Sequence, residues 1–256
     1  MHSSEDILVV SGLSKSFGAL SALSDIDLRI KKGERRAVIG PNGAGKTTLF
    51  NCINGLLPPS SGTIQMNGKD ITRVPTHKRA RLGLARTFQI TNLFTSLTVL
   101  ENVLLAVQAV DPARSSLFYP RDHFRHLSDR AGKLLSDWEL FDEAHTLVSE
   151  LSYGQQRQLE IVLALSGSPA ILLLDEPTAG LSAEERQRLT QMIGNLSRDI
   201  SLMIIEHDID VAFSVAEMVT VLHLGKVLAL GTPHEMENKP EVQEIYLGSD
   251  YADPES

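Results

Sequence analysis

The hydrophobic residues of this chain recur at two spacings that alternate along its length. Short runs rich in aliphatic and β-branched residues predict strands, and apolar residues three and four positions apart predict helices. The predicted strands cover residues 7–13, 25–30, 35–39, 63–66, 84–88, 170–174, 201–205, 217–224 and 226–230. The predicted helices cover residues 48–53, 75–81, 97–108, 156–165, 182–196 and 240–247, with another of about five turns from residue 121.

Strands that alternate with helices predict an α/β fold, in which a mostly parallel sheet is wrapped by helices. The continuous apolar run at 170–174 is typical of a strand buried on both faces of such a sheet. Near the N-terminus, the strand at 25–30 instead alternates apolar and polar residues, and Asn67-Gly68 joins two extended segments as a hairpin turn does. We therefore expect an antiparallel β portion on the N-terminal side.

The stretch from about residue 90 to residue 165 has mainly helical spacing. From residue 121 onward, apolar side chains fall three, four and seven positions apart and form one helix face. These side chains are Phe124, Leu127, Ala131, Leu134, Leu135 and Trp138. We expect residues 1–256 to form a single domain, with a helical subdomain at about residues 90–165 inserted within it.

Composition narrows the range of partners. A net charge of −8 argues against nucleic acid as the main partner, because neutralising phosphates needs basic surface. The single cysteine, Cys52, excludes an internal disulfide and fits a reducing cytosol, and we expect its thiol to be packed. The N-terminus is polar and every apolar run is short, so we expect neither a signal peptide nor a membrane span.

Residues 40–47 carry the strongest chemical signal. They match the phosphate-binding loop pattern of a Gly, four residues and Gly-Lys-Thr, and they lie between a predicted strand and a predicted helix. Such a loop directs backbone N–H groups at phosphate oxygens, and the helix start adds partial positive charge. We expect Lys46 to reach the β- and γ-phosphates of a nucleotide and the Thr47 hydroxyl to hold Mg²⁺. The expected nucleotide-binding residues here are Gly40, Pro41, Asn42, Gly43, Ala44, Gly45, Lys46, Thr47 and Thr48.

Two carboxylates follow the buried strand. Asp175 is expected to hold Mg²⁺ through water, and Glu176 to accept a proton from the attacking water. His207 follows the next strand, and because neighbouring parallel strands end side by side, we expect its imidazole near the γ-phosphate. Lys46, Glu176 and His207 are thus the expected catalytic residues. Gln89, at the joint between the α/β frame and the helical insert, is a candidate for sensing Mg²⁺ or water.

These residues occur in the order and spacing of ABC transporter ATPase subunits, which the chain resembles over nearly its whole length. The segments that carry the resemblance are residues 40–47, 89, 151–155, 172–176 and 207. Among them, the Leu-Ser-Tyr-Gly-Gln signature at 151–155 separates this family from other phosphate-loop ATPases. Members work as head-to-tail dimers with two ATP molecules sandwiched between them. The resemblance therefore implies a phosphate-loop ATPase core, ATP and Mg²⁺ as cofactors, and a second ATPase subunit as a partner.

The resemblance also assigns further site residues. They are Phe17, Gln89, Ser152, Gly154 and Gln155. It implies that Ser152 and Gly154 contact the γ-phosphate bound to the partner's loop. Phe17 takes the base-stacking position, where its local pattern alone favours a core or sheet-edge residue. Gln89 takes the position that contacts the metal and links the ATP state to the membrane partner. Ser182 departs from the pattern, because members usually have there an Asp that contacts the partner subunit.

Segments outside the nucleotide motifs resemble the ATPases of branched-chain amino acid importers. They are residues 85–89, 97–103, 151–155 and 244–248. ATPases of lipopolysaccharide exporters and of urea or other amide importers share several of these features and remain alternatives. The resemblance implies two transmembrane permease subunits, a solute-binding protein in the case of an importer, and a peripheral location at the cytoplasmic face of the cell membrane.

Two other classes fit the sequence less well. Soluble ABC ATPases that act on ribosomes or DNA generally join two cassettes in one chain or insert long coiled coils, and this sequence has neither feature. A GTPase is suggested only by Asn238-Lys239-Pro240-Glu241, which loosely matches the guanine-binding Asn-Lys-x-Asp. We interpret that segment as a solvated helix start. The sequence thus predicts the ATP-hydrolysing subunit of a solute importer.

Overall fold

The computed structural model describes residues 6–87, 93–111 and 121–250. The strands are β1 (Asp6–Phe17), β2 (Leu20–Lys31), β3 (Arg35–Ile39), β4 (Ser61–Met66), β5 (Lys69–Asp70), β6 (Leu84–Arg86), β7 (Ile171–Asp175), β8 (Ser201–Ile205), β9 (Met218–His223) and β10 (Lys226–Gly231). The helices are α1 (Lys46–Asn54), α2 (Thr76–Arg81), α3 (Val99–Val110), α4 (Arg121–Asp137), α5 (Tyr153–Leu165), α6 (Ala183–Gly194), α7 (Ile209–Val215), α8 (Pro233–Glu237) and α9 (Pro240–Asp250), with a 3-10 turn η2 (Val148–Glu150).

The larger sheet has six strands within the described residues, in the order β10-β9-β3-β8-β7-β6. Strands β6, β7, β8, β3 and β9 run parallel to their neighbours, and only β10 is antiparallel among them. Every residue of β3, β7 and β8 is buried. The predicted parallel sheet is therefore confirmed, and β3 and β8 have the predicted bounds.

The smaller sheet is antiparallel and pairs its described strands in the order β2-β1-β4-β5. Its first hairpin is longer than predicted, because β1 continues to Phe17, which pairs with Leu20 at the start of β2. Asn67 (φ 48°) and Gly68 (φ 74°) both have positive φ, as a tight hairpin turn requires, and they join β4 to β5. The expected antiparallel portion is therefore confirmed.

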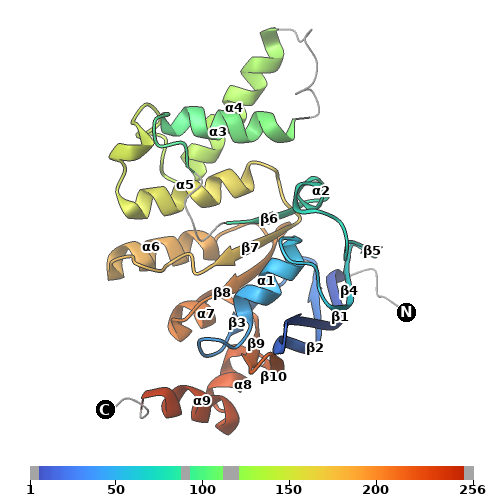
Figure 1. Ribbon diagram of the computed structural model, residues 1–256. Coiled ribbons are helices and arrows are strands. Elements are labelled where there is room, and N and C mark those ends of the chain that lie inside the picture. The colour runs from blue at the N-terminus through green and yellow to red at the C-terminus, as the bar shows by residue number, and fades with distance from the viewer. Residues whose placement is uncertain (1–5, 88–92, 112–120, 251–256) are drawn as a thin grey trace.

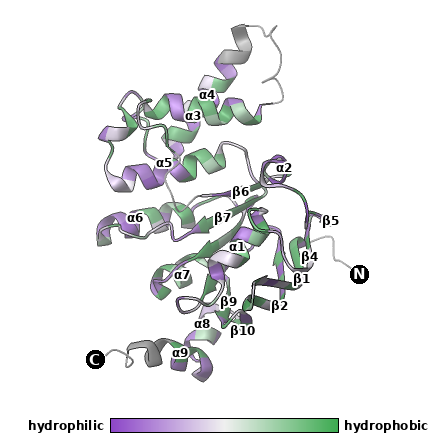
Figure 2. Ribbon diagram, viewed as in Figure 1, coloured by the Kyte–Doolittle hydropathy of each residue, from purple (hydrophilic) through white to green (hydrophobic). Residues whose placement is uncertain are grey.

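Helices α3, α4 and α5 lie together at one end of the molecule, beyond the larger sheet (Figure 1). Leu127, Ala131, Leu135 and Trp138 of the predicted apolar face are buried, and Leu134 is half-buried; the side chain of Phe124 lies outside the description. This face packs in the same apolar cluster as strand residues such as Leu172 and Ile204. Strands of the larger sheet such as β7 are mostly hydrophobic, whereas the helices around it alternate hydrophobic and hydrophilic residues (Figure 2).

Two short helices were not predicted, because neither is long enough to show a helical hydrophobic period. Helix α7 is capped by Asp208, whose carboxylate accepts from the N–H groups of Asp210 and Val211. Helix α8 begins with a capping box between Thr232 and Glu235. Both caps conform to known helix-start patterns, and α8 also has Pro233 at its first position.

Arg79 of the predicted basic helix α2 is buried rather than solvated, with 1% of its surface exposed. Its guanidinium donates to four carbonyl oxygens, those of Cys52 (2.8 Å), Ile53 (2.5 Å), Thr72 (3.0 Å) and Val74 (2.7 Å). Cys52 and Ile53 belong to the last turn of α1, where a cation is favourable, and the Cys52 carbonyl also accepts from the Gly55 N–H. Arg79 therefore joins α2 to the end of the helix that follows the phosphate loop. Cys52 is buried, as predicted.

Candidate nucleotide site

The phosphate loop ends at the start of α1. Gly45 (φ 103°) is the N-cap residue, and no side-chain hydrogen bond caps this helix start within the described residues. A Cβ at Gly45 would lie 2.7 Å from the carbonyl oxygen of Ala22 on β2, so only glycine fits there. The loop therefore presents helix N–H groups without an internal acceptor, which is the arrangement that binds phosphate. Thr47 and Thr48 follow in the first turn and are half-buried.

Lys46 is folded back onto the loop. Its ammonium donates to the carbonyl oxygens of Gly40 (2.6 Å) and Pro41 (3.1 Å). Burial lowers the pKa of Lys46, and the carboxylates of Glu176 and Asp175 oppose that shift. The phosphate loop and the two predicted carboxylates are therefore close enough to interact electrostatically.

Sheet register explains why these residues meet. Val38 of β3 pairs with Ile205 of β8, and Asp175 of β7 pairs with the same Ile205. The loop after β3, the carboxylates at the end of β7 and His207 after β8 therefore leave the sheet at one edge. Ligands of open α/β sheets bind at this carboxyl edge.

Asp175 forms a buried ion pair that the sequence did not predict. Its Oδ2 accepts from the Arg86 guanidinium at 2.6 Å, and the two side chains are 0% and 5% exposed. The same guanidinium donates to Oδ1 of Asn51 on α1 at 2.5 Å. Asp175 Oδ1 is buried and has no hydrogen-bond partner among the described residues. One carboxylate oxygen is thus held and the other is free for a ligand.

That free oxygen fits Mg²⁺ bound together with a nucleotide. No cluster of three or more His, Cys, Asp or Glu side chains in the described residues could hold a metal ion by itself. Mg²⁺, however, is usually bound through one or two carboxylates plus substrate phosphates. Thr47 and Asp175 supply a hydroxyl and a carboxylate of the required kind.

Glu176 and His207 form a direct pair. Glu176 Oε1 lies 2.8 Å from His207 Nε2, and the Glu176 N–H donates to the carbonyl of Ile205 at 2.9 Å. Glu176 has a φ of 48°, a left-handed conformation that is unusual for a residue with a Cβ. Such strain tends to occur at functional sites, where surrounding contacts maintain it. Here it turns the carboxylate toward the imidazole.

Sequence reasoning missed the role of Glu206, which is buried at the end of β8. Its Oε1 accepts from the N–H (3.1 Å) and the hydroxyl (2.8 Å) of Thr178. Burial raises the pKa of Glu206, and the hydrogen bonds from Thr178 oppose that shift. Glu206 ties the turn after Glu176 to the segment that carries His207. The available signal was its place in Glu206-His207-Asp208 at a strand end.

Phe17 lies at the tip of the β1–β2 hairpin, and 47% of the residue is exposed. The local prediction was a core or sheet-edge residue, and this exposure excludes the core. The Lys15 ammonium lies 5.1 Å from the ring centroid. Strand β2 passes the phosphate loop where Ala22 approaches Gly45, so the hairpin tip is near the loop. Gln89, another predicted site residue, lies outside the described residues.

The signature residues form a separate site at the start of α5. Ser152 is the N-cap, as predicted, and shares a capping box with Gln155. Its hydroxyl oxygen accepts from the Gln155 N–H at 3.2 Å, which leaves the O–H group able to donate to a phosphate oxygen. A hollow of about 280 Å³ there is lined by Ser152, Gly154, Gln155 and Glu185, and it contains none of the loop residues.

Glu185 of α6 faces Gly154 across this hollow. A Cβ at Gly154 would lie 2.6 Å from Glu185 Oε1. Hydrogen bonds from Ser182 lower the pKa of Glu185, and a bond from the Gly154 N–H contributes to the same shift. Ser182, which stands in place of the usual Asp, caps α6 through a capping box with Glu185. The expected anion site at Gly154 therefore already contacts a carboxylate of its own chain.

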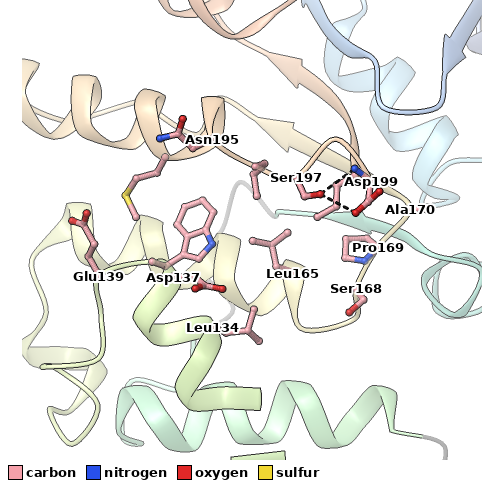
Figure 3. Close-up of a pocket in the computed structure, with 14 residues that line it drawn as sticks. Leu134, Asp137, Glu139, Leu165, Ser168, Pro169, Ala170, Asn195, Ser197 and Asp199 are labelled. Carbon is pink, nitrogen blue, oxygen red and sulfur yellow. Dashed lines mark hydrogen bonds between the residues drawn. The ribbon is translucent and has the colours of Figure 1, made fainter. Parts of the chain in front are cut away.

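Another groove, of about 700 Å³, contains no predicted site residue. It is lined by residues of α4 and α5 and by the segment that leads from α6 to β8 (Figure 3). Trp138 and Leu165 are among its apolar side chains, and Asp137 and Asp199 among its acidic ones. The hydrogen-bonded pair of predicted catalytic residues, Glu176 and His207, lies at the carboxyl edge of the sheet and not in this groove. No described helix has both the length and the apolar character needed to cross a membrane.

Comparison with known proteins identifies the family to which the chain belongs. A family model for ABC transporters matches residues 23–179. The high-affinity branched-chain amino acid transport ATP-binding protein LivG of Salmonella typhimurium is 38% identical over 252 residues, covering 96% of this chain and 99% of that protein. BraF of Pseudomonas aeruginosa, which has the same description, is 37% identical over 252 residues with the same coverage.

Solved structures agree with the fold. The ADP conformation of MJ1267, an ATP-binding cassette of an ABC transporter, matches with a TM-score of 0.83 and 29% identity, covering 95% of this chain and 99% of that one. A dimeric post-hydrolysis structure of the ATP-binding cassette MJ0796 with ADP and Pi matches with a TM-score of 0.74 and 27% identity, covering 88% and 98%. With its phosphate loop, strand-end carboxylates and signature helix in the arrangement described above, the chain belongs to the ABC transporter family, as an ATP-binding ATPase subunit.

Proposed function

We propose that this ATPase powers the import of branched-chain amino acids through a membrane permease. The observation that carries the hydrolytic part is the Glu176–His207 pair beside the phosphate loop, 2.8 Å between Oε1 and Nε2. The substrate class is supported by LivG and BraF, whose names assign them to branched-chain amino acid transport.

In the proposed mechanism, Lys46 exchanges the carbonyls of Gly40 and Pro41 for the β- and γ-phosphates of ATP. The N–H groups at the start of α1 bind the phosphate oxygens. Thr47 and Asp175 would hold Mg²⁺, which would neutralise charge on the transferred phosphate. Glu176 takes a proton from the attacking water, and His207 orients the Glu176 carboxylate through its Nε2 contact.

The exposed ring of Phe17 is proposed to stack on the adenine. Gln89 is proposed to complete the metal site and to connect it with the permease. In this proposal, the helices between about residues 90 and 165 form an inserted subdomain that faces the permeases. Two permease subunits and a solute-binding protein complete the complex at the cytoplasmic face of the membrane.

ATP is proposed to close a dimer in which Ser152, Gly154 and Gln155 of each subunit cover the nucleotide of the other. The separation between the signature hollow and the phosphate loop of the same chain supports this arrangement, because the two do not share lining residues. We expect the Glu176→Gln protein to form dimers when MgATP is added, since slow hydrolysis preserves the closed state. Light scattering measures the mass with and without MgATP. An unchanged monomer mass with ATP bound would contradict the sandwich.

Glu185 offers a sharper test of the same interface, because a γ-phosphate at Gly154 has to displace its carboxylate. Glu185→Gln removes the charge but retains a capping side chain at the start of α6. In the Glu176→Gln background, we expect half-maximal dimerisation at roughly fivefold lower MgATP, because both sites of a dimer lose a repulsive charge. Glu184→Gln, an exposed neighbour, removes the same charge and is the control. Equal MgATP dependence in the two variants would contradict the displacement.

The transported solute is tested with the complete transporter. We expect the chain to copurify from membranes with two permease subunits. After reconstitution in vesicles with the binding protein, we expect leucine, isoleucine or valine to stimulate ATP hydrolysis. Stimulation by urea, or by lipopolysaccharide without a binding protein, would replace the proposed substrate with one of the two alternatives.

A further inference from the structure

We propose that Arg86 is a positioning residue for the metal-binding carboxylate Asp175 and that it couples this carboxylate to the helix that carries Thr47. This inference rests on the nucleotide site proposed above. It concerns a residue that belongs neither to the phosphate loop nor to the strand-end acids.

The first observation is that Arg86 holds one specific oxygen of Asp175. The guanidinium donates to Oδ2 at 2.6 Å, whereas Oδ1 is buried and has no partner among the described residues. A carboxylate held by one oxygen has a defined orientation. The remaining oxygen is then directed at a ligand instead of being shared among several rotamers.

The second observation is that Arg86 is itself held from the other side. Its second terminal nitrogen donates to Asn51 Oδ1 at 2.5 Å, and its guanidinium carbon lies 5.8 Å from the ring centroid of Phe50. The planar guanidinium can make such contacts in two directions at once, which an ammonium cannot do with the same geometry. Asp175 is therefore oriented by a rigid group.

The third observation is the place of Asn51 on α1. Asn51 is four residues after Thr47, and residues four apart lie on the same face of a helix. The chain of contacts Asp175–Arg86–Asn51 therefore connects the strand that supplies the carboxylate with the helix that supplies the hydroxyl. Arg86 thereby determines the spacing between the two protein groups proposed to hold Mg²⁺.

Charge compensation is a second consequence of the same contact. Both side chains of the Arg86–Asp175 pair are almost fully buried, and an unpaired charge in such a place is unfavourable. The Arg86 guanidinium is thus a cationic partner that Asp175 has whether or not a nucleotide is bound.

The test measures metal binding separately from hydrolysis. Mn²⁺ is titrated by electron paramagnetic resonance into protein saturated with a non-hydrolysable ATP analogue, and affinity for the analogue is measured independently in EDTA. We expect Arg86→Met to weaken Mn²⁺ binding by about 10–100-fold, the usual effect of losing a residue that orients a metal ligand. Metal-free nucleotide affinity should stay within about twofold of wild type, and Arg86→Lys should restore part of the Mn²⁺ affinity.

Two further variants complete the experiment. Arg198→Met removes an exposed arginine that pairs with Glu217 and serves as the control, with unchanged Mn²⁺ affinity. Asn51→Ala leaves the buried ion pair in place and is informative even if Arg86→Met does not fold. We expect it to weaken Mn²⁺ several-fold, because the guanidinium loses one anchor.

The outcomes distinguish the role of Arg86 from the proposed nucleotide site on which it depends. If wild-type protein binds the analogue and Mn²⁺, then wild-type Mn²⁺ affinity in a folded Arg86→Met variant would overturn the role of Arg86 alone. Wild-type Mn²⁺ affinity in both Asn51→Ala and Arg86→Lys would do the same. Wild-type protein with no metal-dependent nucleotide binding would overturn the proposed nucleotide site and, with it, this inference.

Discussion

The Glu176→Gln variant is expected to hydrolyse MgATP about 10²–10⁴-fold more slowly than wild type, the usual contribution of a general base. The amide has nearly the same shape as the carboxylate but cannot accept a proton from water. Its contact with His207 can be retained, since Glu176 Oε1 is the atom that lies 2.8 Å from Nε2. Phosphate release in single-turnover experiments measures the rate, and equilibrium binding of labelled ATP should be close to wild type.

Glu184→Gln is the matched control for this prediction, because it removes an exposed carboxylate from α6 without touching the site. The control should hydrolyse ATP at the wild-type rate. If Glu176→Gln and the control have equal rates, Glu176 is not the base. Loss of ATP binding in Glu176→Gln would instead assign the carboxylate a role in holding the nucleotide.

The Arg79→Met variant is expected to lower the free energy of unfolding by about 3–4 kcal/mol, because four carbonyl oxygens would lose a charged donor. Methionine fills part of the same volume but donates no hydrogen bond. Two of the carbonyls end helix α1, so the end of the helix that follows the phosphate loop would lose its cationic cap. Urea denaturation measures the change, and the thermal midpoint should fall by roughly 10 °C.

Arg81→Met on the same helix is the control, because Arg81 is exposed. We expect it to change the free energy of unfolding by less than about 0.5 kcal/mol, as surface substitutions usually do. Equal effects of the two substitutions would show that the four carbonyl contacts of Arg79 do not stabilise the fold.

Local sequence was sufficient for the elements whose residues interact mainly with their immediate neighbours. The bounds of β3 (Arg35–Ile39) and β8 (Ser201–Ile205) were predicted without error, because a continuous apolar run between turns has few other stable conformations in a parallel sheet. The N-cap at Ser152 was equally predictable, since it depends on residues within one helical turn. Short α7 and α8 were missed because one or two turns carry no measurable period.

The candidate site likewise contains residues that the sequence alone locates and residues that it does not. The sequence alone locates the short motifs that lie at strand ends. These are the phosphate loop, Asp175-Glu176 and His207. Arg86 and Glu185 carry no such local signal. Arg86 is 89 residues from Asp175 and 35 residues from Asn51, and its role depends on sheet order and on the packing of α1.

By itself, the sequence determined the α/β architecture, because backbone hydrogen bonding and hydrophobic periodicity act over neighbouring residues. Its short motifs also carried the resemblance to the family and located the loop that is proposed to bind nucleotide. Only the tertiary structure decided that Arg79 is a buried cap, that Glu185 lies at Gly154, and that Arg86 leaves one oxygen of Asp175 free. From sequence alone, a charged side chain is expected to be exposed to water. A buried charged side chain instead needs an oppositely charged or hydrogen-bonding group beside it. Which partner is available depends on how distant segments pack.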